Sequence, residues 1–152
     1  MQRHERERSP KESGRPISDS DPFALFDYVA KQLNRFGLAY LHIIEPRIKG
    51  NMLIAEGQGH IATARLRKIF TGKIIAAGGF ERDTAEAAVR ESDADLVAFG
   101  RHFVANPDLP KRIRLGLPLN AYDRDTFYTF DARGYTDYPF YEQRSESLAS
   151  TL

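Results

Sequence analysis

A strand–helix–strand pattern in the second half of the chain constrains the fold more than any other feature. It begins with a short apolar run, Lys73–Ala77, and contains a second one, Asp95–Phe99. Between the two runs, a capping-box pair formed by Asp83 and Glu86 predicts a helix over residues 84–91. Two strands separated by one helix of this length are expected to be parallel neighbours joined by a right-handed crossover.

Both predicted strands end in glycine turns, which parallel pairing would bring to the same, C-terminal edge of the sheet. The first turn holds Gly78 and Gly79, and the second holds Gly100 and Arg101. Glycine lets the backbone approach a ligand and point N–H groups at it, and arginine adds a permanently charged fork suited to phosphate oxygens. We expect a short helical turn over 102–105 beside them. The pattern predicts an anion site, while two ordinary turns with a surface arginine explain the spacing equally well.

A third apolar run lies upstream of this pattern. We interpret Leu38–Ile44 as a strand buried on both faces, because it is a continuous apolar run with one histidine, His42. His42 is interpreted as a hydrogen-bonded core histidine, with a catalytic role as the alternative. After the strand, Glu45 and Arg47 are expected to form a structural ion pair, with a substrate or cofactor contact as the alternative. The order βαβαβ is typical of a parallel sheet.

Helices are predicted on both sides of this strand. Capping residues at 18–21 and Pro22 predict a first helix that Gly37 closes. A loop at 48–59 leads to a second helix, which ends at Gly72. The apolar positions of the first helix trace one face, which we interpret as core packing rather than a partner surface: Leu25, Phe26, Val29, Leu33 and Phe36.

The remaining segments define the expected domain bounds. A capped helix is predicted over 108–115, and the aromatic-rich segment 117–141 is expected to wrap over a surface made by other elements. Residues 17–143 are expected to form one domain, flanked by a disordered or divergent arm at 1–16 and a flexible tail at 144–152.

Length and composition exclude several classes of protein. A chain of 152 residues is long enough for one core but too short for a (β/α)₈ barrel of ~250 residues. Its net charge of +1 argues against a nucleic-acid partner, and the absence of cysteine excludes disulfides, thiolate metal sites and cysteine nucleophiles. We predict no metal site. Without a transmembrane stretch or a signal peptide, the expected location is cytoplasmic, with no membrane partner.

The order of the motifs along the chain is similar to that of a known family. It resembles the Old Yellow Enzyme family, and within it the branch of 12-oxophytodienoate reductases. The resemblance covers roughly residues 17–143. The motifs that carry it are LHIIEPR (41–47), IIAAGGF (74–80), DLVAFGRHFVANPDLPKRIRLGLPLN (95–120), YDRDTFY (122–128) and GYTDYPFY (134–141).

The resemblance implies a cofactor and assigns residues to it. The family consists of FMN-dependent (β/α)₈ oxidoreductases that take hydride from NADH or NADPH and reduce activated C=C bonds, commonly of α,β-unsaturated carbonyls. The likeness implies that Gly78, Gly79, Gly100 and Arg101 hold the FMN phosphate. It also places Tyr135 beside the flavin and the substrate, with packing of this tail aromatic on the barrel rim as the alternative.

The resemblance covers only part of the family's fold. It implies an α/β chain that forms the C-terminal portion of a TIM barrel, with about three of its eight strands. The earlier strands carry the flavin-ring contacts, the residue pair that binds the substrate carbonyl and the tyrosine that protonates the substrate. Where the family has an Arg-x-Ser-Pro motif, Ser9-Pro10 remains but Glu7 takes the arginine position. The expectation is an incomplete barrel from a truncated, rearranged or mis-started gene product.

The function expected from the resemblance is that of an FMN-dependent NAD(P)H oxidoreductase acting on a small-molecule enone. No catalytic residue is assigned within this chain, so activity of the chain alone stays open. The alternatives are a non-catalytic FMN- or phosphate-binding module and an inactive gene remnant. Because an incomplete barrel leaves unpaired strand edges, self-association or pairing with the missing half of the barrel is a further expectation.

Overall fold

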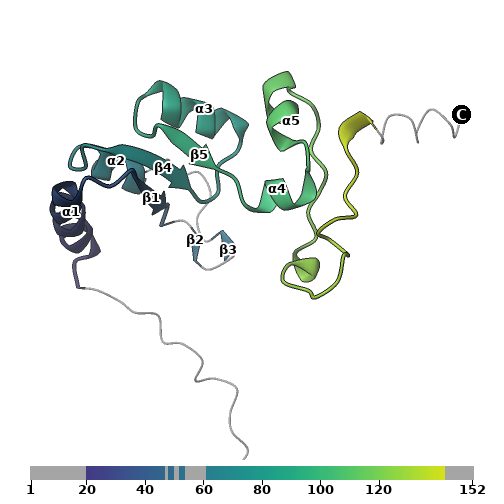
Figure 1. Ribbon diagram of the computed structural model, residues 1–152, viewed down its shortest axis with the longest axis horizontal. Coiled ribbons are helices and arrows are strands. Elements are labelled where there is room, and N and C mark those ends of the chain that lie inside the picture. The colour runs from purple at the N-terminus through teal and green to yellow at the C-terminus, as the bar shows by residue number, and fades with distance from the viewer. Residues whose placement is uncertain (1–19, 47, 50–51, 54–60, 143–152) are drawn as a thin grey trace, which may run out of the picture.

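The computed structural model describes residues 20–46, 48–49, 52–53 and 61–142 (Figure 1). The arm predicted at 1–16 and the tail predicted at 144–152 lie outside these residues. In chain order the elements are α1 (Pro22–Leu33), η1 (Asn34–Phe36), β1 (Tyr40–Ile44), β2 (Ile48–Lys49), β3 (Met52–Leu53), α2 (Ile61–Arg67), β4 (Lys73–Ala77), α3 (Arg82–Arg90), β5 (Leu96–Ala98), α4 (Arg101–Ala105), α5 (Leu109–Leu115) and η2 (Arg124–Thr126).

A three-stranded parallel sheet in the order β1-β4-β5 is the centre of the fold. Ile43 pairs with Ala76, and Ala77 pairs with Ala98, so the C-terminal ends of the strands meet at one edge. This confirms the predicted βαβαβ order. The segment 48–59, predicted as a loop, differs in part, because β2 and β3 form a short antiparallel ladder there.

The core lies where α2 and α3 pack on the central strand β4. Ile74 and Ala76 of β4 are fully buried, and Leu66, Phe70 and Ala88 pack around them. Burying these apolar side chains is the main favourable term in folding.

The helix α3 begins earlier than the sequence predicts. Its N-cap is Glu81, whose backbone N–H donates to Thr84 Oγ1 over 2.9 Å. The pair predicted to cap the helix, Asp83 and Glu86, therefore lies inside it. Both pairs have the spacing of a capping box, so sequence alone did not separate them.

The strand β1 is an edge strand and not the strand buried on both faces that the apolar run predicts. Among the described residues its one neighbouring strand is β4, and only Ile43 of β1 is buried, whereas Tyr40 and Ile44 are exposed. His42 is exposed as well, so the interpretation as a core histidine is wrong. An apolar run indicates that a strand is suited to burial, but burial also requires other elements that pack on both of its faces.

The apolar face of α1 differs from the prediction in the same way. The helix forms as expected, with Asp21 Oδ1 accepting from the backbone N–H of Ala24 over 3.0 Å. However, Ala30 is its only buried residue, and Phe26 is 57% exposed. Among the described residues, one side of α1 therefore lacks a packing partner. A groove of about 530 Å³ runs between α1 and β1, lined mainly by apolar side chains.

A buried carboxylate fixes the start of α2. Glu45, at the end of β1, is fully buried and accepts from the backbone N–H groups of Ala62 (3.1 Å) and Thr63 (3.0 Å) and from the Thr63 hydroxyl. These N–H groups have no partner within the helix, so the carboxylate acts as its cap. Arg47, the partner predicted for Glu45, lies outside the described residues.

A second carboxylate joins β5 to β4 and α2. Asp95 accepts from Lys73 Nζ over 2.8 Å, from the backbone N–H of Ile74 over 2.9 Å, and from Arg67 Nη2. Hydrogen bonds from Lys73 and from the Ile74 N–H, together with Arg67, lower the pKa of Asp95 from 3.8 to about 2. The ionised form is therefore favoured by the fold.

The segment after β5 leaves the sheet and is held by polar contacts (Figure 1). The fully buried Arg112 of α5 donates to Asp108 Oδ1 (2.6 Å) and to the backbone carbonyls of Pro118 (3.1 Å) and Pro139 (2.9 Å). The α5 helix itself matches the prediction. The expectation that the aromatic segment wraps over other elements is wrong for several of its rings, which are exposed: Tyr128, Phe130, Tyr135 and Phe140.

Replacing Glu45 with alanine is expected to destabilise the fold by about 2–3 kcal/mol, because two helix N–H groups and one hydroxyl lose a buried acceptor. Denaturant unfolding of the two proteins would measure this difference. The matched control is Glu86→Ala, which removes an exposed glutamate from α3 and is expected to change the free energy of unfolding by less than about 0.5 kcal/mol. Equal losses in both variants would contradict a capping role.

Replacing Asp95 with asparagine tests its lowered pKa. A carboxylate whose pKa falls on folding stabilises the protein above its ordinary pKa, and loses that effect as the pH falls through the folded value. The stability difference between the unaltered protein and Asp95→Asn is expected to contain a part of about 2 kcal/mol that is present at pH 6 and disappears between pH 4 and pH 2. Unfolding curves over this range, with the exposed Asp83→Asn as control, would measure it. A difference independent of pH would contradict the assignment.

Candidate anion site

The two glycine turns lie side by side at the C-terminal edge of the sheet. The register of β4 and β5 pairs Ala77 with Ala98, and the turns follow directly after these residues. Gly78 has a φ of +100° and Gly79 a φ of +66°, which is the left-handed region that other residues rarely adopt. The first turn therefore needs glycine for its backbone path.

The backbone path at Gly100 does not require glycine. Its φ of −89° is open to any residue, but it lies where β5 passes into α4. A Cβ built at Gly100 would meet no atom within 4 Å among the described residues. Among the described residues, the space that a side chain at Gly100 would occupy is therefore open.

Arg101 is the cation of the site. Its Nη2 donates to Glu81 Oε1 over 3.2 Å, and its guanidinium carbon lies 5.6 Å from the centre of the Tyr122 ring. The side chain is 19% exposed, so it is packed but reachable from solvent. Within the described part of the chain, Glu81 is the hydrogen-bond partner of this guanidinium. Since a guanidinium has five N–H donors, most of them stay available to an incoming anion.

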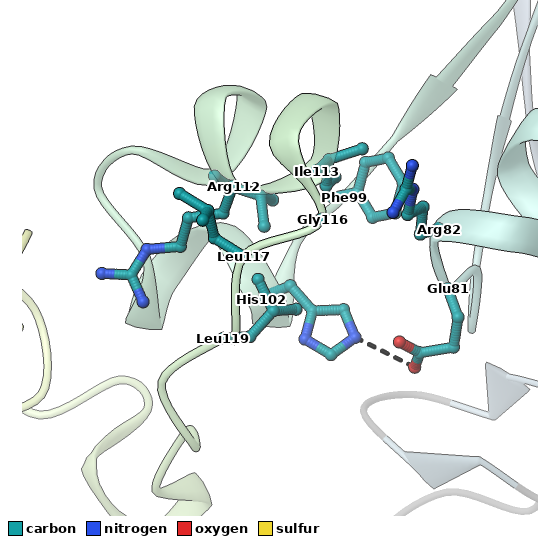
Figure 2. A pocket seen from close by; sticks show the side chains of 10 residues that line it. Glu81, Arg82, Phe99, His102, Arg112, Ile113, Gly116, Leu117 and Leu119 are labelled. Atoms are coloured by element: carbon teal, nitrogen blue, oxygen red, sulfur yellow. Dashed lines mark hydrogen bonds and ion pairs between the residues drawn. The ribbon is translucent and has the colours of Figure 1, made fainter. Parts of the chain in front are cut away.

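His102 shares the same carboxylate oxygen. Its Nε2 lies 3.0 Å from Glu81 Oε1, as Figure 2 shows, and its ring meets the ring of Tyr122 edge-on at 5.7 Å. The side chain is 13% exposed, and its Nδ1 is buried with no hydrogen-bond partner among the described residues. Two donors from adjacent residues thus converge on one oxygen of Glu81.

A small cavity lies behind this pair. It has a volume of about 140 Å³, and Glu81 and His102 form one part of its wall (Figure 2). The rest of the wall is largely apolar, and its apolar side chains come from the residue after β5, from α5 and from the segment after α5: Phe99, Leu109, Ile113, Leu117 and Leu119. The cavity adjoins the site at Glu81 and His102, but the two glycine turns and Arg101 do not line it.

Sequence reasoning missed Glu81 and His102 as parts of the site. Glu81 was overlooked because the helix was expected to begin two residues later, which placed Glu81 in an undefined turn. His102 was assigned only to the helical turn at 102–105, which the structure confirms as α4. The available signal was the position of Glu81 three residues after Gly78, opposite an arginine on the neighbouring turn.

Tyr135 lies apart from these residues. Its hydroxyl accepts from the backbone N–H of Tyr128 over 3.0 Å, and its ring is 43% exposed. Among the described residues, its hydrogen bond holds it to the C-terminal segment and not to the glycine turns. The structure therefore brings together four of the five predicted site residues.

Other kinds of site find no support in the described ranges. They contain no group of three or more His, Asp or Glu side chains placed to hold a metal ion. Likewise, every helix they contain is too short or too polar to cross a membrane.

Comparison with known proteins identifies relatives with much longer chains. The chain is 52% identical over 137 residues to 12-oxophytodienoate reductase 1 of Oryza sativa subsp. japonica, which covers 88% of this chain and 35% of the relative. It is 49% identical over 125 residues to 12-oxophytodienoate reductase 2 of Arabidopsis thaliana, covering 82% and 33%. The chain therefore spans about a third of the length of the curated relatives it matches.

Solved structures agree in fold over the same portion. Morphinone reductase matches with a TM-score of 0.69 and 44% identity, covering 84% of this chain and 33% of that one. The old yellow enzyme from Trypanosoma cruzi matches with a TM-score of 0.70 and 36% identity, covering 81% and 31%. The three parallel strands and their helices are thus part of a TIM barrel, here incomplete, as the sequence predicted.

A family model decides the assignment. It describes the NADH:flavin oxidoreductase / NADH oxidase family, whose members use FMN, and it matches residues 9–120, which include both glycine turns and Arg101. With the relatives and the solved structures, this match shows that the chain belongs to the NADH:flavin oxidoreductase / NADH oxidase family, as the resemblance to Old Yellow Enzymes predicted.

Proposed function

We propose that this chain supplies the phosphate-binding part of an FMN site. One observation carries the proposal: the parallel register of β4 and β5 places two glycine turns and Arg101 at the same edge of the sheet. Because the chain belongs to this family, FMN is the ligand expected to place its phosphate at that edge. A phosphate at the C-terminal edge of parallel strands also agrees with how barrel enzymes hold phosphorylated ligands.

The residues present fit a phosphate group. The left-handed Gly78 and Gly79 let the backbone turn tightly without side chains in the way. The open space in front of Gly100 offers room for a ligand, and Arg101 has N–H donors to spare. In this proposal, backbone N–H groups of the turns and the Arg101 guanidinium hold the phosphate oxygens.

Tyr135 has a separate place in the proposal. Its hydroxyl accepts from the Tyr128 N–H and keeps its own O–H as a donor, so a contact with the flavin or the substrate would use this O–H or the exposed ring face. The alternative is that the ring only packs against neighbouring protein.

The proposed reaction is the one typical of the family. Bound FMN would supply hydride transfer from NADH or NADPH to an activated C=C bond of a small α,β-unsaturated carbonyl compound. Residues of this chain would bind and orient the cofactor through its phosphate, and none of them is assigned a catalytic step. Residues 17–143 form the functional unit in this proposal, in a cytoplasmic protein.

A second candidate is an FMN- or phosphate-binding module without catalysis by this chain alone. The exposed apolar face of α1 and the edge position of β1 favour it, because both surfaces are suited to packing against further protein. Pairing with another half-barrel, or with a second copy, would then be needed to complete the flavin site.

Replacing Arg101 with alanine is expected to weaken FMN binding by about 10- to 100-fold, because one or two charge-assisted hydrogen bonds to the phosphate are lost. Quenching of flavin fluorescence on titration with the full chain measures the affinity. Riboflavin, which has no phosphate, should bind more weakly and be indifferent to the substitution.

The control for this experiment is Arg114→Ala, which removes an exposed arginine from α5, away from both glycine turns. It should leave FMN affinity unchanged. Equal affinity of the unaltered protein for FMN and riboflavin, or an Arg101→Ala variant that binds FMN normally, would show that the phosphate assignment is wrong.

A further inference from the structure

The carboxylate of Glu81 lies at the point where side-chain nitrogens of Arg101 and His102 converge. Its Oε1 is 3.2 Å from Arg101 Nη2 and 3.0 Å from His102 Nε2. An oxygen held by two such donors is placed as a phosphate oxygen would be in a binding site. Glu81 itself stands at the start of α3, directly after the first glycine turn.

The two sides of this contact differ in how firmly they are held. Arg101 and His102 are mostly buried and both lie against the ring of Tyr122. The side chain of Glu81 is 56% exposed. Its backbone N–H donates to Thr84 Oγ1, and its side chain accepts from the backbone N–H of Thr84, which completes the capping box of α3. The two donors are therefore mostly buried, while the acceptor is an exposed side chain whose displacement costs one helix cap.

A phosphate dianion and the Glu81 carboxylate cannot share this place without a cost, because like charges a few ångströms apart repel each other. We propose that Glu81 is an internal competitor for the anion site: its carboxylate occupies the place of a phosphate oxygen until a phosphate displaces it. This inference rests on the proposed phosphate site. It also makes His102 a second side-chain donor to the phosphate, since displacement of Glu81 leaves Nε2 facing the anion.

A consequence of this arrangement is selectivity among anions. A ligand must outcompete a carboxylate that is covalently attached beside the site and so has a high effective concentration. A dianionic phosphate ester gains two fixed donors and can do so, whereas a monoanion gains less. Glu81 thus lowers the affinity for every anion and favours doubly charged ones.

The substitution Glu81→Gln tests the competition with little change of shape. Glutamine keeps an oxygen for Arg101 and His102 but removes the negative charge. FMN binding by the full chain, followed by flavin fluorescence, is expected to become about threefold tighter at 0.15 M salt, a modest gain because the exposed carboxylate is screened by solvent. Inorganic phosphate should compete with FMN more effectively in the variant, and riboflavin affinity should not change.

Two further variants test whether the gain depends on the contact between Glu81 and Arg101. Glu86→Gln carries the same charge change at an exposed position of α3 and should leave FMN affinity unaltered. In the Arg101→Ala background, Glu81→Gln should give a clearly smaller gain than in the unaltered protein, because one of the two donors for which the carboxylate competes is gone. An undiminished gain in that background, or an equal gain from Glu86→Gln, would show a long-range charge effect and overturn the inference.

The remaining outcomes separate this inference from the phosphate site on which it rests. If Glu81→Gln weakens FMN binding while Arg101→Ala also weakens it, the phosphate site stands, but Glu81 positions Arg101 and does not compete. Unchanged affinity in Glu81→Gln overturns the competition in the same way. If Arg101→Ala binds FMN normally, the phosphate site itself is wrong, and the inference falls with it.

Discussion

The hydrogen bonds of Asp95 determine how β5 lies against β4, and the candidate site depends on that placement. Parallel strands receive no help from a tight turn in setting their register, because a helix always separates them. Here the carboxylate reaches Lys73 and the Ile74 N–H at the start of β4, and Arg67 of α2. A slip of one residue would turn the side chains of β5 to the opposite face and separate Arg101 from the first glycine turn.

The two ends of the sheet differ in what holds them. At the N-terminal end of the strands, the charged network around Asp95 is structural, and it lies at the edge of the sheet opposite to the candidate site. At the C-terminal end, Glu45 turns inward to cap α2, while Glu81 and Arg101 remain reachable from solvent. The three acidic residues thus differ in place: Asp95 joins the strands, Glu45 caps a helix and Glu81 faces the candidate site. Glu45 is fully buried, whereas the Glu81 side chain is exposed.

Local patterns predicted the central part of the fold well, because they depend on neighbours in the chain. The strand at 73–77, the glycine turns and the helix closed by Gly116 follow from apolar runs, left-handed glycines and caps. Burial of β1 and of α1 was predicted wrongly, since it depends on which elements lie opposite. Glu81 was missed for a related reason: its role arises from a contact with a turn twenty residues away.

The buried polar contacts around Arg112 determine the spacing between α4 and the segment that carries Tyr135. Asn120 donates to the carbonyls of Ala105, at the end of α4, and of Pro139, while Arg112 also holds Pro139. The end of α4, at Ala105, and the segment that carries Tyr135, at Pro139, are therefore both held by hydrogen bonds from Asn120. Any motion of α4 would carry the segment that holds Tyr135 with it, so the spacing between these two parts of the chain is preset.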